Sequence, residues 1–511
     1  MNRNVLIATV VSILSRAALA QAPAPSAVPA PVAERADFQM GLTTLDAMHK
    51  KGALSDAEYD AALKDLADIG SRAVSASTLV TGKFATTFYG FVEGDFIHDT
   101  TQSFNELAGM SPIVKPSTNG GGNAGDNGRT MFAIRNSRLG FRLKAPEVNG
   151  IRASAQLEMD FFGNQPGSPP VAGASAPSGA LSATLAESSF FNNPTFRVRH
   201  FLLKLDNDFV NVWIGQTWEL AGWQGQFQPS TVAIQGLPGQ LYSRTAQLRL
   251  DKVFHLGPTT VEIAAAALRP PQMNAEIPDF QGGIKLAIDG WTGVQTASAT
   301  GGTSINPATI GLSGGVRSFR LAQSLTTSDY ARVTGHVVAL DLMIPVIPAK
   351  ERGEWALTFV GEATTGTGDA EMFTNLKGGA GVGAPNGVTS AQYTAAKLND
   401  IDTGLAGWIN TDGSIGTVNW KTLLLSAQLY LPPSGKLWLS GSFSNTLSDN
   451  VTFFGAAPAV WWHETWWDLN VFADVTPAVR LGLEYSHFQQ TYGDGVSAAN
   501  DRVQFSGFFI F

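Results

Sequence analysis

Apolar and polar side chains alternate along the chain from about residue 86 to its last residue. In residues 151–161, the odd positions from Ile151 to Phe161 carry apolar side chains, and the even positions from Arg152 to Asp160 carry polar ones. Successive side chains of a β-strand point to opposite faces of a sheet. The pattern therefore predicts strands that have one apolar and one polar face.

Many segments of this kind follow one another, and runs of about ten alternating residues separated by turn residues are typical of β-barrels that span a membrane. The predicted strands are 86–98, 131–144, 150–162, 196–206, 208–217, 243–253, 258–269, 279–288, 309–322, 332–344, 354–364, 417–431, 436–446, 464–475, 478–490 and 502–511. We therefore predict an all-β fold, a transmembrane antiparallel β-barrel of about 16 strands, with apolar side chains toward lipid and polar ones toward the interior.

The predicted connections alternate in length, as expected for short periplasmic turns and long external loops. The short turns are 145–149, 206–208, 431–435 and 476–477, and the long loops are 99–130, 163–195, 218–242 and 365–416. The segment 289–308 breaks this rule, because it is long where a periplasmic turn is needed. It is either an insertion or a sign that the strand count is wrong by one hairpin. Loops 163–195 and 218–242 are the candidates for folding inward and narrowing the channel.

The two ends of the sequence carry export signals. Residues 503–511 alternate and end on an aromatic side chain, as the final strands of Gram-negative outer-membrane barrels usually do. Near the start, Arg3, an apolar stretch at 5–14 and a small-residue cleavage pattern at 18–20 predict a signal peptide over 1–20. The apolar stretch is too short for a membrane-spanning helix. We therefore expect the protein in the outer membrane of a Gram-negative bacterium.

Two further segments are predicted between the signal peptide and the barrel. Residues 21–35 are rich in Ala and Pro, which indicates an extended linker. Residues 36–75 carry apolar positions at helical spacing on either side of Gly52, which predicts a periplasmic helical hairpin, and the barrel follows at 86–511. Two short helices cannot bury such apolar stripes alone, so the hairpin either packs on a partner or is a linker of marginal helicity.

Composition supports a barrel and excludes several classes of function. Charged residues make up 15% of the 511 residues, against about 25% in soluble domains. The chain has no Cys, which excludes disulfides and thiolate metal sites, and we predict no cofactor and no metal. The formal net charge of −8 argues against nucleic-acid binding, which favours basic surfaces.

A barrel of about 16 strands encloses an aqueous channel, and its inward face decides what passes. The charged residues predicted on that face are Glu93, Asp95, Arg138, Arg142, Arg152, Glu158, Asp160, Arg197, Arg199, Arg249, Lys285 and Arg317. The excess of Arg predicts a constriction that attracts small anions, since guanidinium groups suit carboxylates and phosphates. In the alternative, the Arg side chains pair with neighbouring carboxylates and only brace the wall.

Three stretches of the barrel, 134–163, 196–218 and 277–288, resemble DcaP-like outer-membrane porins. The most specific features are the hairpin in the first stretch and the F-R-V-R-H and G-Q-T-W sequences in the second. The resemblance covers most of the barrel. It implies a homotrimeric, sixteen-stranded diffusion channel with an N-terminal periplasmic extension, set in outer-membrane lipid and lipopolysaccharide, for small anionic solutes such as dicarboxylates. The basic pore residues that it implies are Arg138, Arg142, Arg197 and Arg199. The N-terminal helices depart from the family, because they are short and separated by a Gly.

Two other classes of protein share this location. A barrel lipase or protease needs a Ser, a His and an acid on the wall, but none of the seven His residues lies in H-E-x-x-H or near G-x-S-x-G. The Gly-rich run 378–383 lacks the Lys and Ser/Thr of a phosphate-binding loop. We therefore predict that the chain is not an enzyme. A barrel enzyme and a non-conducting adhesin or anchor are the alternatives to a porin.

Overall fold

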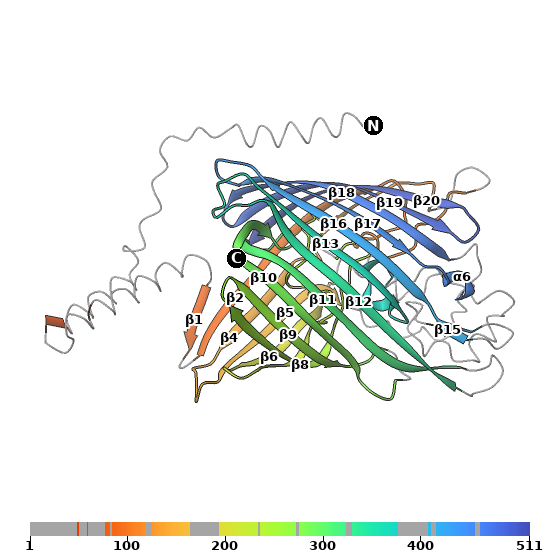
Figure 1. The fold of residues 1–511 in the computed structure, drawn as a ribbon. Helices are drawn as coiled ribbons and strands as arrows, with labels where there is room; N and C mark the ends of the chain where they lie inside the picture. Colours follow the sequence, from red (N-terminus) through yellow and green to blue (C-terminus); the bar gives the residue numbers. More distant parts are fainter. Residues whose placement is uncertain are drawn as a thin grey trace, which may run out of the picture. The chain divides into compact units, whose positions relative to one another are not determined.

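The computed structural model describes residues 49–50, 59, 77–81, 84–117, 124–163, 194–233, 236–271, 275–322, 330–376, 407–409, 415–454 and 460–511 (Figure 1). The chain forms two compact units, residues 1–78 and 79–511. In the first unit His49, Lys50 and Tyr59 are helical, and the rings of His49 and Tyr59 stack with centroids 4.3 Å apart. The predicted signal peptide, linker and most of the helical hairpin lie outside the described residues. Within the described ranges, no helix is long and apolar enough to cross a membrane.

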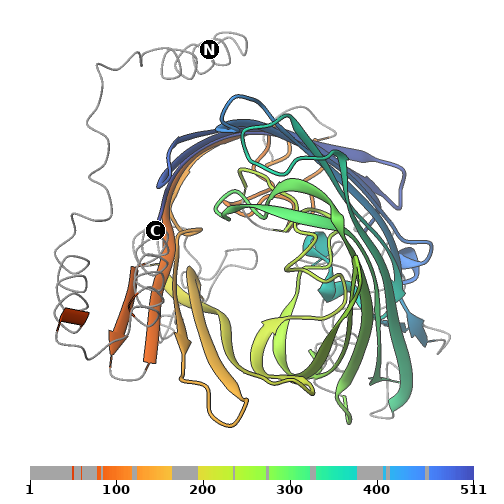
Figure 2. The same ribbon diagram turned by 60° about the vertical axis from the view of Figure 1, so that its left-hand side comes forward.

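The second unit is a closed antiparallel β-barrel of 16 strands. Its strands in ring order are β2 (Phe84–Asp99), β3 (Arg129–Ala133) with β4 (Arg138–Lys144), β5 (Arg152–Gly163), β6 (Thr195–Asp206), β7 (Asn211–Trp218), β8 (Arg244–Leu256), β9 (Thr259–Leu268), β10 (Asp279–Thr296), β11 (Thr303–Ala322), β12 (Tyr330–Ile347), β13 (Ala356–Thr367), β16 (Asn419–Tyr430), β17 (Leu437–Leu447), β18 (Trp461–Thr476), β19 (Val479–Tyr492) and β20 (Ser497–Ile510). β3 and β4 count as one strand, because both pair with β2. Pairing of β2 with β20 closes the ring (Figure 2). The predicted fold class and strand number are confirmed.

A few short elements accompany the barrel. β1 (Ser77–Thr81) pairs with β2, and β14 (Gly407–Ile409) pairs with β15 (Ile415–Thr417) in a separate two-stranded sheet. The short helices are η3 (Ala370–Met372), η4 (Thr374–Leu376) and α6 (Val451–Phe454). η3 and η4 belong to the connection between β13 and β16, where the side chains of Met372, Phe373 and Leu376 are buried.

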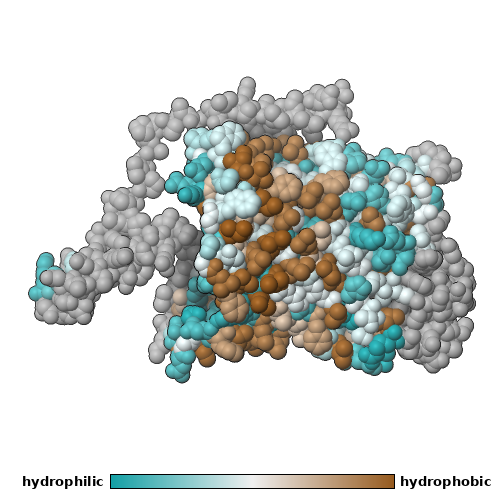
Figure 3. Space-filling model, in the orientation of Figure 1, coloured by the Kyte–Doolittle hydropathy of each residue, from teal (hydrophilic) through white to brown (hydrophobic). Residues whose placement is uncertain are grey.

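The two faces of the strands differ as the alternation predicted. On the outer face, large apolar side chains such as Phe132 (71% exposed), Phe201 (64%) and Leu469 (55%) meet the surroundings. Figure 3 shows a broad apolar band over the strands, with hydrophilic side chains on either side of it. On the inner face, polar side chains such as Gln428 and Asn470 are buried. Apolar side chains outside and polar ones inside are the arrangement of a barrel in lipid.

The connection between β7 and β8, residues 219–243, folds into the barrel. Its described residues are mostly buried, and its backbone N–H groups donate to side chains of the strands that it lies against. These bonds join Leu220 to Gln281 (2.8 Å), Gly222 to Ser313 (2.9 Å), Val232 to Asn470 (2.9 Å), Ala233 to Glu484 (2.9 Å) and Leu241 to Glu362 (2.8 Å). The inward loop, as we call residues 219–243, therefore covers the wall from β10 to β19. The prediction that loop 218–242 folds inward is confirmed, whereas most of loop 163–195 lies outside the described residues.

The segment 289–308, which broke the rule of short periplasmic turns, is an insertion rather than a counting error. β10 continues to Thr296 and β11 begins at Thr303, so most of the segment is strand. The β10–β11 ladder shifts its register between Ile288 and Thr292, and such a bulge bends a hairpin. Beyond the bulge the hairpin tip, residues 292–303, enters the barrel, where Val294 and Ala299 are fully buried.

Candidate functional site

A cluster of charged side chains lies on the inner face of β4, β5 and β6. The sequence alternation alone would place Arg197, Arg199 and Phe201 on one face of β6. Instead β6 carries a bulge, since Glu158 of β5 lies opposite His200 while Met159 lies opposite Val198. The extra residue lets Arg199 and His200 both point inward, where they are 3% and 6% exposed, and turns Phe201 outward. The bulge therefore concentrates polar side chains at one height of the barrel.

The Arg side chains of this cluster contact two carboxylates of β5. Arg197 binds Asp160 through two hydrogen bonds of 3.0 and 2.6 Å. Arg199 bridges both acids, with 2.7 Å from its Nε to Glu158 and 3.0 Å from its Nη1 to Asp160. Arg138 of β4 lies 4.0 Å from Glu158. The pairing that we considered as the alternative therefore exists for Arg197 and Arg199.

Sequence analysis missed two residues of this cluster, Tyr242 of the inward loop and Arg244, which begins β8. The guanidinium of Arg244 lies 4.5 Å from the centroid of the Trp218 ring, and Trp218 lies 4.4 Å from Tyr242. Arg199 donates to the Tyr242 hydroxyl at 3.5 Å. Arg244 comes directly after Tyr242 and Ser243 in the sequence. It joins the cluster only because the loop before it folds into the barrel. The only sequence signal was its position next to an aromatic-rich loop.

Cations outnumber anions in this cluster. Among the described residues, four guanidinium groups, on Arg138, Arg197, Arg199 and Arg244, face the two carboxylates of Glu158 and Asp160. No carboxylate in the described ranges lies within ion-pair distance of Arg244, and its Nη1 is buried without a hydrogen bond. We call these six residues with Tyr242 the arginine cluster. Its excess of positive charge would attract an anion.

Tyr242 is itself affected by this charge. It lies on the inward loop rather than on a membrane-spanning strand. Burial raises the pKa of its hydroxyl. The positive charges of Arg199, Arg138 and Arg244 lower that pKa by a larger amount, so that it is about 7, below the usual value for a tyrosine. The positive charge of the cluster is therefore expected to depend on pH near neutrality.

A second group of predicted residues lies on β8 to β10. Arg249 and Lys285 share Glu262, at 3.6 and 2.7 Å. They line a cavity of about 330 Å³ together with Trp213 and Trp223. Lys285 lies 4.8 Å from the centroid of the Trp223 ring, and Arg249 lies 5.0 Å from that of Trp213. This cavity is wide enough for a small solute.

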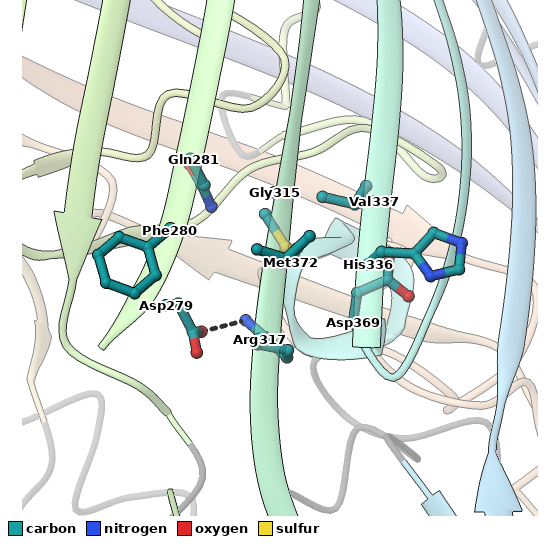
Figure 4. Close-up of a pocket in the computed structure, with 10 residues that line it drawn as sticks. Asp279, Phe280, Gln281, Gly315, Arg317, His336, Val337, Asp369 and Met372 are labelled. Atoms are coloured by element: carbon teal, nitrogen blue, oxygen red, sulfur yellow. Dashed lines mark ion pairs between the residues drawn. The ribbon is translucent and has the colours of Figure 1, made fainter. Parts of the chain in front are cut away.

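Three of the predicted Arg residues lie apart from the arginine cluster. Arg142 of β4 is exposed, with its guanidinium 3.9 Å from the Tyr89 ring centroid. Arg152 begins β5 and lies 3.8 Å from Glu147 beside the β4–β5 turn. Arg317 of β11 is buried and binds Asp279 at 2.8 Å (Figure 4), as well as Glu371. The cavity beside Arg317 measures about 10 Å³, which holds about one water molecule, so Arg317 is a wall residue here.

The two acids predicted on β2 are also enclosed. Glu93 and Asp95 are buried, and Asp95 accepts a hydrogen bond of 2.6 Å from Ser506 of the closing strand β20. Asn136 lies 3.5 Å from Glu93. These acids therefore lie at the seam of the barrel. In the part of the chain that the structure describes, no group of three His, Cys, Asp or Glu side chains could hold a metal ion.

Comparison with solved structures identifies the fold. No family model matches the chain, and none of the curated proteins is detectably similar to it in sequence. The outer-membrane channel DcaP of Acinetobacter baumannii superposes with a TM-score of 0.57 over 85% of this chain and 100% of that chain, at 16% sequence identity. This chain has the fold of that channel. The resemblance to DcaP-like porins is therefore confirmed at the level of the fold.

Other outer-membrane proteins are similar to a lesser degree. An anion-selective porin from Comamonas acidovorans matches 84% of this chain and 100% of its own, at 11% identity and a TM-score of 0.46. OmpF of Salmonella typhi, solved with daunomycin, matches 85% of this chain and 100% of its own, at 9% identity and a TM-score of 0.45.

Proposed function

We propose that this protein is an outer-membrane diffusion porin for small hydrophilic anions, such as dicarboxylates. The observation that carries the proposal is the arginine cluster, where four guanidinium groups face two carboxylates and the side chain of Arg197 stays 37% exposed. A planar guanidinium stays charged at all relevant pH values and binds carboxylates through two parallel hydrogen bonds. The excess charge would concentrate anions locally in the lumen, although the whole chain is acidic.

The position of the inward loop supports the same sign of selectivity. Several acids of the opposite wall accept hydrogen bonds from this loop, including Glu362 from the Leu241 N–H and Glu484 from the Ala233 N–H. Asn375, from the β13–β16 connection, likewise donates to Glu464 at 2.9 Å. These carboxylates are covered by protein and do not face the open lumen. By contrast, Arg249 and Lys285 line the cavity of about 330 Å³, and Arg197 of the arginine cluster is half-buried rather than enclosed.

We also propose where the protein lies in the cell and how it assembles. We place the barrel in the outer membrane of a Gram-negative bacterium, with residues 1–20 removed as a signal peptide and the helical hairpin 36–75 in the periplasm. We also propose a homotrimer. The apolar outer face of the strands supports the membrane location, and the likeness of the fold to DcaP supports the assignment to channels rather than to barrel enzymes or anchors.

A selectivity measurement tests the anion proposal. In the double variant Arg138→Gln with Arg244→Gln, the excess of guanidinium over carboxylate groups disappears. We expect the reversal potential of the refolded channel in a KCl gradient to move toward cation selectivity. Arg152→Gln removes one charge at the rim and serves as the matched control, with little change. An unchanged reversal potential in the double variant would show that these residues only brace the wall. A folded barrel without any conductance would favour the enzyme or anchor.

A further inference from the structure

The hairpin tip, residues 292–303, contacts the far side of the barrel. Arg480 of β19 donates hydrogen bonds to the carbonyls of Ala299 and Gly301 in this tip. Between β11 and β19 the ring contains β12, β13, β16, β17 and β18, and neighbouring strands lie about 4.8 Å apart. Following the wall would therefore need a path of roughly 29 Å. The tip reaches Arg480 because it crosses the lumen.

Aromatic side chains on the inner face hold the tip in place. Tyr430, Trp438 and Phe472 point inward near the periplasmic ends of β16, β17 and β18, and each is fully buried. The rings of Trp438 and Phe472 stack with centroids 4.0 Å apart, and Val294 and Ala299 of the tip belong to the same apolar cluster. The inner face of such a barrel is polar and faces water. Apolar rings on this face therefore need another segment packed over them to exclude water. The tip supplies this cover.

Polar contacts fix the same position. Gln428 of β16 accepts from the Thr296 N–H at 3.0 Å and donates to the Thr296 carbonyl at 3.1 Å. The Tyr430 hydroxyl bonds to the Thr296 hydroxyl at 2.7 Å. Arg480 is held in turn by Asp474 at 2.5 Å. A segment with buried apolar contacts and satisfied polar groups is stable against local opening, so the tip is a fixed part of the lumen.

The tip also meets the inward loop. Gln295 donates to the carbonyl of Gln226 at 3.2 Å, and Ser230 donates to the carbonyl of Thr296. Ser230 is itself bonded to Ser440 of β17 at 2.6 Å. The inward loop enters from the side of the external loops and the tip from the side of the periplasmic turns, so together they form one partition. It covers the wall from β10 to β19.

We infer that the hairpin tip 292–303 is a second selectivity element, which closes part of the periplasmic half of the lumen and sets the upper size of the solutes that leave it. The Arg249–Lys285 cavity lies between this partition and the wall, since Trp223, Gln224 and Gln226 of the inward loop line it, and we place the solute route on that side. This inference rests on the proposed porin function. It adds that the size limit and the charge preference come from different segments, since the tip itself carries no charged side chain.

Removing the tip tests this division. Thr292 and Pro307 lie opposite each other in the ladder, so Asn-Gly in place of residues 293–306 makes a two-residue hairpin there. We expect single-channel conductance to rise roughly two-fold, because conductance follows the open cross-section, and trisaccharides to enter liposomes faster. The sign of the reversal potential should stay the same. Unchanged conductance and trisaccharide entry would overturn the inference. A wider channel without anion preference would instead contradict the proposed function.

A labelling experiment keeps the inference testable if the shortened barrel fails to fold. The chain has no Cys, so single Cys variants can be labelled cleanly. Ala299→Cys should react with a charged thiol reagent at least about ten-fold more slowly than Glu351→Cys, because a docked tip shields position 299, whereas Glu351 is exposed in the β12–β13 turn. Adding Arg480→Gln should raise the rate at position 299. Equal rates for Ala299→Cys and Glu351→Cys would mean that the tip does not dock.

Discussion

Arg199 and His200 are neighbours in the sequence and both point into the lumen, because the bulge in β6 places one extra residue there. A regular strand would have turned one of them toward lipid, where a charged side chain costs about 2–4 kcal/mol. The bulge thus allows Arg199 to bridge Glu158 and Asp160 while His200 bonds to Thr217 at 3.1 Å. This single irregularity therefore adds His200 to the inner face beside the arginine cluster.

Tyr242 gives the arginine cluster a pH dependence. Because its pKa is about 7, its hydroxyl is neutral at lower pH and becomes a tyrosinate as the pH rises. The tyrosinate would offset one guanidinium and halve the positive excess. We expect the anion preference, measured as reversal potential, to fall as the pH rises from 6 to 8. Tyr242→Phe should show no such change over this range, and an equal fall in both proteins would assign the effect to another group.

Loss of Arg502 should lower the stability of the barrel, because its ion pair with Asp99 is fully buried. It is fully buried and binds Asp99 through bonds of 2.9 and 2.8 Å, and it also donates to the carbonyl of Glu106. Arg502→Gln leaves a buried carboxylate without its partner, which costs about 3–5 kcal/mol. We expect a lower denaturant midpoint for the detergent-refolded barrel.

The exposed pair of Lys421 and Asp449, at 2.6 Å, offers a matched control for Arg502→Gln. Each of its side chains is about half exposed, and such pairs contribute about 0–1 kcal/mol. Lys421→Gln should therefore leave the denaturant midpoint nearly unchanged. If the two variants had equal denaturant midpoints, burial of the Arg502–Asp99 ion pair would not contribute to the stability of the barrel.

At the scale of elements, the alternation of apolar and polar side chains was sufficient to place the strands. Each strand faces lipid on one side and water on the other, so its side chains alternate accordingly. The ends of β5, β6, β16 and β17 differ from expectation by only a residue or two. The hairpin β10–β11 differs more, since 289–308 was expected to be a connection. Its inward bend depends on contacts with β16 and β19, which lie far away in the sequence, so no local pattern could reveal it.

The site could be predicted less completely than the fold, for the same reason. Arg138, Arg197 and Arg199 lie together because the alternation and the order of neighbouring strands fix their positions. Arg317 was expected to line the lumen, but η3 of the β13–β16 connection approaches it and Glu371 binds it. Arg244 was missed because its contacts, with Trp218 at the end of β7 and with Tyr242, depend on the inward fold of the loop. Whether each predicted residue lines the solute path stays a prediction.

At the scale of the whole molecule, the two units are expected to contribute differently. Residues 79–511 form a compact unit of their own, so the barrel should fold without the helical hairpin. We expect a variant lacking residues 34–75 to run as a heat-modifiable barrel in SDS gels, while the trimer that we propose for the full chain loses resistance to SDS. A trimer of unchanged resistance would show that the helical hairpin has no role in assembly.

The partition also has a mechanical consequence. A ring of strands that is joined only through its ladders can flatten when the surrounding bilayer presses on it. Here the inward loop joins β7 and β8 to strands as far as β19, and the hairpin tip joins β10 and β11 to Arg480. These crossing segments connect opposite sides of the ring of strands and resist its deformation. The cross-section of the lumen should therefore keep its shape when lipid composition or lateral pressure changes.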